Sequence, residues 1–225
     1  MSGEPLRYEL KFVALPTETS NILQWLRAHR LVFRENYPPR RVSSVYFDSL
    51  EYSDYAQTIG GVSGRSKVRL RWYGKQTSEI TGQLEVKNKR NFLSWKLIYE
   101  LVTPLSLDES WSRITERLRR NVARTALPWL VERPMPVIMN SYMRRYFETP
   151  GGSIRATVDT DQQVYDQRYG ARPNLRRRTP ISPATILEVK MAPELAPEVG
   201  SALAGLPLRL TRNSKYCQAV QYLSA

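Results

Sequence analysis

The sequence lacks most of the side chains that enzymes use as nucleophiles or as tight metal ligands. It has a single cysteine, Cys217, and a single histidine, His29, in 225 residues. These counts exclude a disulfide framework, a cysteine-based zinc site and a cluster of histidine ligands. They also leave His29 as the one histidine that a Ser-His or Cys-His pair could use, with no second histidine in reserve. We expect His29 to be an exposed or helix-capping side chain, and Cys217 to be a packing residue in a reducing compartment.

Long apolar runs and acidic residues are also scarce. No stretch approaches the roughly 20 apolar residues of a membrane helix, and residues 1–9 contain no apolar core of a signal peptide. We therefore expect a soluble, cytoplasmic protein that forms one domain over residues 1–225. The 34 lysines and arginines outnumber the 21 acidic residues, which gives a net charge of +13. Such an excess favours a polyanionic partner, which is nucleic acid, anionic lipid or a phosphate chain.

The apolar pattern predicts many strands and a few amphipathic helices. Period-two alternation and short β-rich runs indicate the strands, and apolar residues at helical spacing indicate the helices. The expected strands cover residues 7–13, 41–48, 65–73, 82–89, 92–101, 137–147, 153–160 and 185–191. The expected helices cover residues 17–30, 50–58, 108–127 and 215–223, and residues 172–180 are expected to form a basic loop.

Charge alternates with apolar residues in several of these strands. Residues two apart share a face of a strand, so Arg65, Lys67, Arg69 and Arg71 lie together, with apolar residues on the opposite face. Glu-x-Lys triplets at 9–11, 85–87 and 188–190 place an acid beside a cation in the same way. If the apolar faces lie under the helices, the charged faces line the inside of a curved or closed sheet. An open sheet with one charged solvent face is the alternative.

Cations dominate the set of residues that this arrangement would turn inward. Buried charges without partners are costly, so a surplus of cations predicts a polyanionic ligand such as a phosphate chain. The inward cations are Arg7, Lys11, Lys67, Arg69, Arg71, Lys87, Lys89, Arg155 and Lys190, and the inward acids are Glu9, Glu85, Asp159 and Glu188.

A set of short motifs over nearly the whole chain resembles the triphosphate tunnel metalloenzymes. Within that superfamily the closest resemblance is to the polyphosphate polymerase domain of the vacuolar transporter chaperone (VTC) complex, in a stand-alone, bacterial-like form. The motifs are Arg7–Lys11, Ser44–Asp48, Lys67–Gly74, Leu84–Lys87, Ser141–Arg145, Ile154–Asp159, Leu187–Lys190 and Ser214–Tyr216.

The resemblance implies an α+β fold, in which a closed eight-stranded antiparallel β-barrel forms a triphosphate tunnel and helices pack on its outside. It implies catalytic roles for Lys11, Arg69, Arg71, Lys87 and Glu188. It implies that Glu188 holds Mn²⁺ or Mg²⁺, with Glu9 and Glu85 as further candidates. The implied phosphate-binding residues are Arg7, Lys11, Lys67, Arg69, Arg71, Lys87, Lys89, Lys96, Arg144, Arg155, Lys190, Ser214 and Lys215.

The expected reaction transfers the terminal phosphoryl group of a nucleoside triphosphate, with ATP as the first candidate, to polyphosphate or a pyrophosphate primer. Phosphoryl transfer needs aligned phosphates, neutralised charge and a hard metal ion rather than a protein nucleophile. Hydrolytic members of the superfamily carry Glu-x-Glu-x-Lys on the first strand, whereas this sequence has Arg7 at the first position. That departure favours a polymerase over a triphosphatase.

Other functions stay open at this point. One is a tunnel hydrolase of tripolyphosphate, nucleoside triphosphates or thiamine triphosphate, and another is a polyphosphate-binding module without turnover. Nucleic-acid binding through the basic loop at 172–178, with Tyr165 and Tyr169 as stacking platforms, is not expected, because strictly alternating cations suit an enclosed site better. The sequence leaves open the nucleotide preference, the polymer length, the identity of the metal and the oligomeric state.

Overall fold

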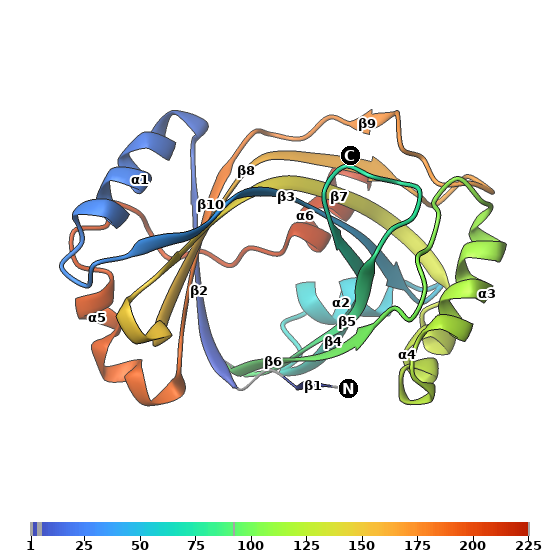
Figure 1. The fold of residues 1–225 in the computed structure, drawn as a ribbon, viewed down its shortest axis with the longest axis horizontal. Coiled ribbons are helices and arrows are strands. Elements are labelled where there is room, and N and C mark those ends of the chain that lie inside the picture. Colours follow the sequence, from blue (N-terminus) through green and yellow to red (C-terminus); the bar gives the residue numbers. More distant parts are fainter. Residues whose placement is uncertain (1, 4–5, 92, 225) are drawn as a thin grey trace.

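Eight long strands form one closed antiparallel ring (Figure 1). The computed structural model describes residues 2–3, 6–91 and 93–224. The order around the ring is β2-β10-β8-β7-β3-β4-β5-β6, and β6 pairs with β2 to close it. Two short strands, β1 and β9, pair with β6 and β8 outside this cycle. The closed tunnel sheet predicted from the sequence is confirmed.

The ring strands are β2 (Arg7–Ala14), β3 (Arg34–Asp48), β4 (Gly64–Tyr73), β5 (Gly82–Arg90), β6 (Leu93–Glu100), β7 (Met135–Glu148), β8 (Ile154–Asp166) and β10 (Thr185–Met191). The short strands are β1 (Ser2–Gly3) and β9 (Arg178–Thr179). The helices are α1 (Thr19–Ala28), α2 (Ser53–Ile59), α3 (Trp111–Asn121), α4 (Leu127–Glu132), α5 (Val199–Ala202) and α6 (Lys215–Ser224).

Helices cover two outer faces of the ring. α3 packs on the apolar face of β4 and β5 through Trp111, Ile114 and Leu118, beside α4. α1 packs on the apolar face of β2, β8 and β10 through Ile22 and Leu26, next to α5. Full burial of one such side chain contributes about 1.5–3 kcal/mol to stability. Since side chains alternate along a strand, burial of these apolar faces turns the charged faces toward the inside of the ring.

The helices α2 and α6 stand at one end of the ring (Figure 1). The ring of Tyr216 on α6 stacks on Tyr46 of β3 with a centroid distance of 5.2 Å. Its hydroxyl donates a hydrogen bond of 2.5 Å to Asp48, at the end of β3. Asp48 also accepts hydrogen bonds from the backbone N–H groups of Asp54 (2.9 Å) and Tyr55 (3.1 Å) in the first turn of α2. One buried carboxylate therefore holds both helices over this end.

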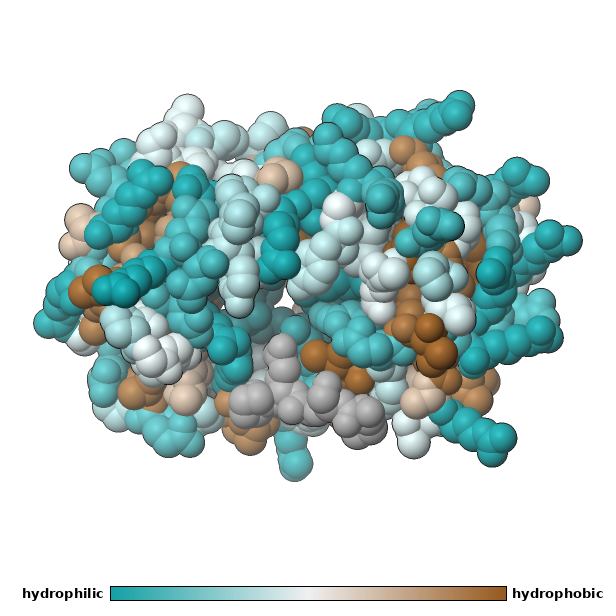
Figure 2. All heavy atoms as spheres, in the orientation of Figure 1, coloured by the Kyte–Doolittle hydropathy of each residue, from teal (hydrophilic) through white to brown (hydrophobic). Residues whose placement is uncertain are grey.

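The other end of the ring faces the viewer in Figure 1. Figure 2 shows that this face is hollowed near its centre, between hydrophilic side chains.

No described helix is long and apolar enough to cross a membrane.

Several element boundaries differ from those expected. β3 begins at Arg34 and β8 ends at Asp166, because both strands pair with β7 over most of its length. The helix expected over 108–127 is shorter, and a separate 3-10 turn follows it at Arg124–Ala126. The basic loop contains the short strand β9, which pairs with β8. His29 is the C-cap residue of α1, which is one of its two expected roles, but its side chain is buried and not exposed. The strand start expected at Phe92 lies outside the described residues.

Candidate functional site

β4 places four cations on the inner face of the ring, as its alternation predicted. Lys67, Arg69 and Arg71 line the interior with Arg65 nearer the end that α2 and α6 cover. Gly82 on β5 allows the neighbouring strand to lie close, because a Cβ at that position would lie 2.3 Å from the carbonyl oxygen of Arg71. A larger residue there would displace β5 and with it the carboxylate that fixes these arginines.

The inside of the ring contains a cavity of about 670 Å³. Among the described residues that line it, twelve are lysine or arginine, and Glu188 is the one carboxylate. Twelve like charges around one space repel each other, so the cavity favours a multiply charged anion. The lining cations are Lys11, Lys67, Lys87, Lys89, Lys96, Lys190, Lys215, Arg65, Arg69, Arg71, Arg144 and Arg212.

Glu85 lies buried between three cations in the cavity wall. It accepts a hydrogen bond from Nε of Arg69 (2.7 Å), and Nη1 of Arg71 lies 3.4 Å away. Nζ of Lys96 lies 3.6 Å from the same carboxylate, and the amide of Gln83 donates to it at 2.8 Å. Burial disfavours the charged carboxylate, but the cations outweigh burial and hold the pKa of Glu85 well below its usual value. Glu85 thus fixes both guanidinium groups.

A chain of alternating charges runs across β5, β2 and β10. Nζ of Lys87 lies 2.6 Å from Oε2 of Glu9, and Nζ of Lys11 lies 2.8 Å from Oε1 of Glu9. Lys11 also lies 3.4 Å from Oε2 of Glu188. The other oxygen of Glu188 lies 2.7 Å from Nζ of Lys190. Three ammonium groups share two carboxylates, so this chain of residues carries surplus positive charge.

Burial opposes every charge in this chain, and its balance with the neighbouring charges sets the direction of each pKa shift. Burial and repulsion by Glu188 raise the pKa of Glu9, but Lys11 and Lys87 outweigh them and hold it well below its usual value. Burial lowers the pKa of Lys11, but the two carboxylates raise it above its usual value. For Lys87 burial outweighs the attraction of Glu9 and lowers the pKa to about 7. Lys87 therefore changes charge near neutral pH.

Asp159 connects the ring to the start of α6. Arg144 donates two hydrogen bonds to its carboxylate, at 2.6 and 2.7 Å, and Nζ of Lys215 lies 2.6 Å from Oδ2. Burial raises the pKa of Asp159, but the two cations outweigh it and lower the pKa below its usual value. The hydroxyl of Ser214 accepts a hydrogen bond from the backbone N–H of Cys217 (3.4 Å). Ser214 and Lys215 are thus held at the covered end of the cavity.

Glu9 and Glu188 are the carboxylates best placed to hold a divalent metal ion. Glu188 is buried and Glu9 is largely so, both are charged, and Lys11 lies between them. Glu85 fits less well, because three cations and an amide already surround it. Within the described part of the chain, no group of three or more His, Cys, Asp or Glu side chains is placed to hold a metal. Mg²⁺ commonly binds one or two carboxylates together with phosphate oxygens and waters. Glu9 and Glu188 therefore fit a metal that binds with phosphate.

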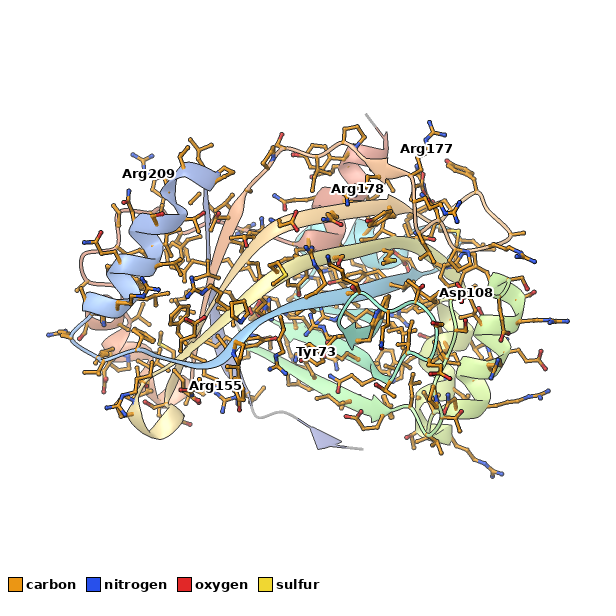
Figure 3. The ribbon with its side chains drawn as sticks, turned by 45° about the horizontal axis from the view of Figure 1, so that its top comes forward. Tyr73, Asp108, Arg155, Arg177, Arg178 and Arg209 are labelled. Carbon is orange, nitrogen blue, oxygen red and sulfur yellow. The ribbon has the colours of Figure 1, made fainter. Side chains whose placement is uncertain are left out.

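Most residues expected to bind phosphate line the cavity, and two lie elsewhere. Arg7 and Arg155 line a second cavity of about 350 Å³, which shares Lys190 with the first. Nε of Arg155, labelled in Figure 3, donates a hydrogen bond of 2.8 Å to Glu148. Arg212 lines the first cavity but was not expected from the sequence, because it lies in an irregular segment before α6 and not in an alternating strand. Phosphate binding by each of these residues stays a prediction.

A sequence model of the VTC domain matches residues 6–224. The chain belongs to the VTC domain family. The match includes every ring strand, and it extends through α6, so both the cavity wall and the helix at its end are family features.

Solved structures share the fold of this VTC domain. One is a protein from Pyrococcus horikoshii OT3 (12% identity, TM-score 0.51, covering 96% of this chain and 98% of that chain). Another is a candidate adenylate cyclase from Vibrio parahaemolyticus (12% identity, TM-score 0.51, covering 97% and 98%). A third is a candidate adenylyl cyclase from Hippeastrum with a dominant triphosphatase activity (14% identity, TM-score 0.55, covering 97% and 95%).

At these identities the likeness establishes the fold alone. Together with the family match, it places the chain in the triphosphate tunnel metalloenzyme superfamily, as the sequence motifs indicated. Tunnel metalloenzymes generally use a divalent metal ion.

Proposed function

We propose that this VTC domain extends inorganic polyphosphate with the terminal phosphoryl group of a nucleoside triphosphate, with ATP as the first candidate. The observation that carries the proposal is the cavity, in which twelve cations face one lining carboxylate inside a closed ring. Nucleoside triphosphate and polyphosphate both match that surplus of charge. Reaction between two phosphate chains also needs no protein nucleophile. Among the described residues that line the cavity there is no histidine, and Cys217 is the one cysteine.

The cations would align the phosphates. Arg69 and Arg71 are oriented by Glu85 before any ligand binds, so they bind phosphate oxygens with little reorganisation. Lys87 on the neighbouring strand β5 and Lys11 on β2 would bind further phosphates, and Lys215 those near the covered end. Alignment of the attacking and leaving oxygens inside such a rigid frame lowers the entropic part of the barrier.

Glu188, with Glu9 beside it, would hold Mn²⁺ or Mg²⁺. When bound, the metal ion would supply charge neutralisation at the phosphate oxygens. Lys190 and Lys11 now contact Glu188 at 2.7 and 3.4 Å, and Lys11 also contacts Glu9 at 2.8 Å. Their ammonium groups become available to phosphate once another cation takes their place.

Two features favour a polymerase over a hydrolase. Arg7 stands where hydrolytic relatives carry a carboxylate, and it lines the second cavity together with Arg155. Lys190 joins the two cavities, so cations continue beyond the space that a single triphosphate needs. An acceptor chain of several phosphates finds partners over this length, whereas hydrolysis requires only water.

The test is a polymerisation assay. Purified protein is incubated with ATP, Mn²⁺ and a pyrophosphate primer, and the products are separated on a gel stained for polyphosphate. A ladder of chains supports the proposal. Release of orthophosphate without a ladder indicates a tunnel triphosphatase, and binding without either product indicates a polyphosphate-binding module.

Glu188→Gln separates turnover from binding. The variant keeps the shape of the side chain but loses the charged oxygen ligand, so polymer synthesis should fall by orders of magnitude. Titration calorimetry with tripolyphosphate should still detect binding, because Arg69 and Arg71 remain. Glu116→Gln on the outer surface of α3, where the side chain is 57% exposed, is the matched control and should leave both unchanged. Normal metal-dependent synthesis by Glu188→Gln would move the metal to another carboxylate.

A further inference from the structure

An arginine lies among three tyrosines at the end of the ring opposite α2 and α6. The guanidinium carbon of Arg40 lies 5.0 Å from the ring centroid of Tyr37, 4.9 Å from that of Tyr73 and 5.0 Å from that of Tyr146. The rings of Tyr37 and Tyr146 also meet edge to face at 6.0 Å. We call these four residues the Arg40 cluster.

The local sequence explains why Arg40 points inward. Tyr37 is followed by Pro38 and Pro39, which have no backbone N–H to donate to a sheet. The pairing of β3 with β7 shifts register between Tyr37 and Arg40, as at a β-bulge. A bulge redirects side chains and is common next to functional sites. After it, Arg40 pairs with Arg144, which lines the main cavity.

Arg40 differs from the cavity arginines in its partners. Arg144 is neutralised by two hydrogen bonds to Asp159, and Arg69 by Glu85. Arg40 has no ion pair with any described carboxylate, and its buried Nε has no hydrogen-bond partner among the described residues. The structure thus holds a cation by aromatic rings alone, at a point where its charge is available to a ligand.

The Arg40 cluster continues the row of phosphate-facing side chains on β4. Arg69, Arg71 and Tyr73 alternate along one face of that strand, about 7 Å apart from one to the next. A ligand with phosphates beside Arg69 and Arg71 therefore brings its next group to Tyr73, which Figure 3 labels.

The aromatic rings at this end are accessible, unlike those of the main cavity. Tyr37 is 54% exposed and Tyr73 is 47% exposed. Tyr46 and Tyr142, which line the cavity near α6, are 6% and 2% exposed and hydrogen-bond Arg69 and Arg71. A flat ring can therefore stack at the Arg40 cluster, whereas the covered end offers mainly cations.

We infer that the Arg40 cluster binds the aromatic base of the nucleoside triphosphate. Tyr73 and Tyr37 supply stacking faces, and Arg40 supplies a cation beside the base and sugar. The base then lies at the open end, and its phosphates extend past Arg71 to the carboxylates Glu9 and Glu188. The inference rests on the proposed function for the presence of a nucleotide, but it concerns binding and not turnover.

The test compares two ligands that differ in the base. Affinities for ATP and tripolyphosphate are measured by titration calorimetry without divalent metal, so no turnover occurs. Tyr73→Leu should weaken ATP binding about 5- to 150-fold, which corresponds to the roughly 1–3 kcal/mol of one stacked base. Its affinity for tripolyphosphate should change less than about twofold. Tyr73→Phe keeps the ring and should bind both ligands normally. Tyr169→Leu, which removes another exposed tyrosine that stacks on an arginine, is the matched control.

A second measurement uses the unaltered protein. The fluorescence of 2-aminopurine riboside triphosphate should be quenched on binding, because stacking quenches this base, and excess ATP should reverse the quenching. Equal weakening of ATP and tripolyphosphate by Tyr73→Leu, unchanged ATP affinity, or absence of quenching would each overturn the inference. Failure of the polymerase proposal would appear in the product gel instead, with these binding results intact.

Discussion

Substitution of Glu85 tests whether a buried carboxylate stabilises the protein by neutralising the cations that line the tunnel. The carboxylate is 1% exposed and holds Arg69, Arg71 and Lys96 in place. We predict that Glu85→Gln strongly destabilises the ligand-free protein, because three cations inside the ring then lose their shared, buried counter-charge. The glutamine fills the same volume, so the effect reports on charge and not on packing.

The size of the effect follows from burial. Removal of one partner of a buried ion pair costs about 3–5 kcal/mol. For chains of 150–250 residues each kcal/mol corresponds to about 2–4 °C in Tm. Together these values predict a loss of about 6–20 °C. Tripolyphosphate at a hundred times its Kd stabilises the native state by about 2.7 kcal/mol, so the ligand should recover a large part of this loss by becoming the counter-charge.

The assay is thermal unfolding followed by circular dichroism, with and without tripolyphosphate. The matched control is Glu35→Gln. Glu35 accepts two hydrogen bonds from Arg145, at 2.7 and 2.6 Å, but the pair lies on the surface with both side chains 26% exposed. Exposed pairs contribute about 0–1 kcal/mol, so the control should lose at most about 4 °C.

The stability of Glu85→Gln should also respond differently to acid. The pKa of Glu85 is lowered in the folded protein, so its contribution is present above the usual carboxyl pKa and is lost as pH falls through the folded value. The gap in Tm between the two proteins should therefore narrow at low pH. A loss of Tm no larger than that of Glu35→Gln, at neutral pH, would refute the view that Glu85 neutralises the cavity arginines.

Three further predictions concern ligand binding. Arg69→Ala and Arg71→Ala should each abolish polymer synthesis and weaken tripolyphosphate binding by about 1.5–3 kcal/mol in calorimetry, because each removes a charge-assisted contact; normal synthesis in either would remove that residue from the site. Because burial lowers the pKa of Lys87 to about 7 and bound phosphate favours its charged form, binding of tripolyphosphate in EDTA at pH 8 should take up about one proton more in the unaltered protein than in Lys87→Met. Uptake is measured by calorimetry in two buffers of different ionisation enthalpy, and an unchanged value in the variant would contradict the assignment. Tripolyphosphate should raise Tm more than double-stranded DNA at equal phosphate concentration and about 150 mM salt, whereas equal stabilisation would favour a nucleic-acid ligand.

The sequence alone predicted the polar interior, because alternation along a strand is a local property. The row from Arg65 to Arg71 specifies one charged and one apolar face wherever the strand lies. The helix with Trp111, Ile114 and Leu118 specifies which face is covered. These faces fit a curved or closed sheet, and the family resemblance gave both its closure and the number of strands.

The sequence could not predict which charges neutralise each other. Glu85 lies directly opposite Arg69 across β4 and β5, but its contact with Lys96 depends on the register of a third strand. Lys87 on β5 and Glu9 on β2 are separated by β6, and the two-residue pairing of β6 with β2 brings their side chains together. The sequence analysis also missed Arg212 and the Arg40 cluster. Arg212 lies in an irregular segment and Arg40 follows a bulge, and neither kind of segment has a periodic pattern. Such positions depend on long-range pairing and not on local sequence.

Closure of the ring also affects how the chain can be made. β2, near the start of the chain, lies between β6 and β10, and β10 comprises residues 185–191. During synthesis the ring therefore stays open until β10 has left the ribosome. Until then β2 and β8 present unpaired strand edges that can join another chain. Truncation before β10 should therefore yield an open, aggregation-prone sheet rather than a smaller folded ring.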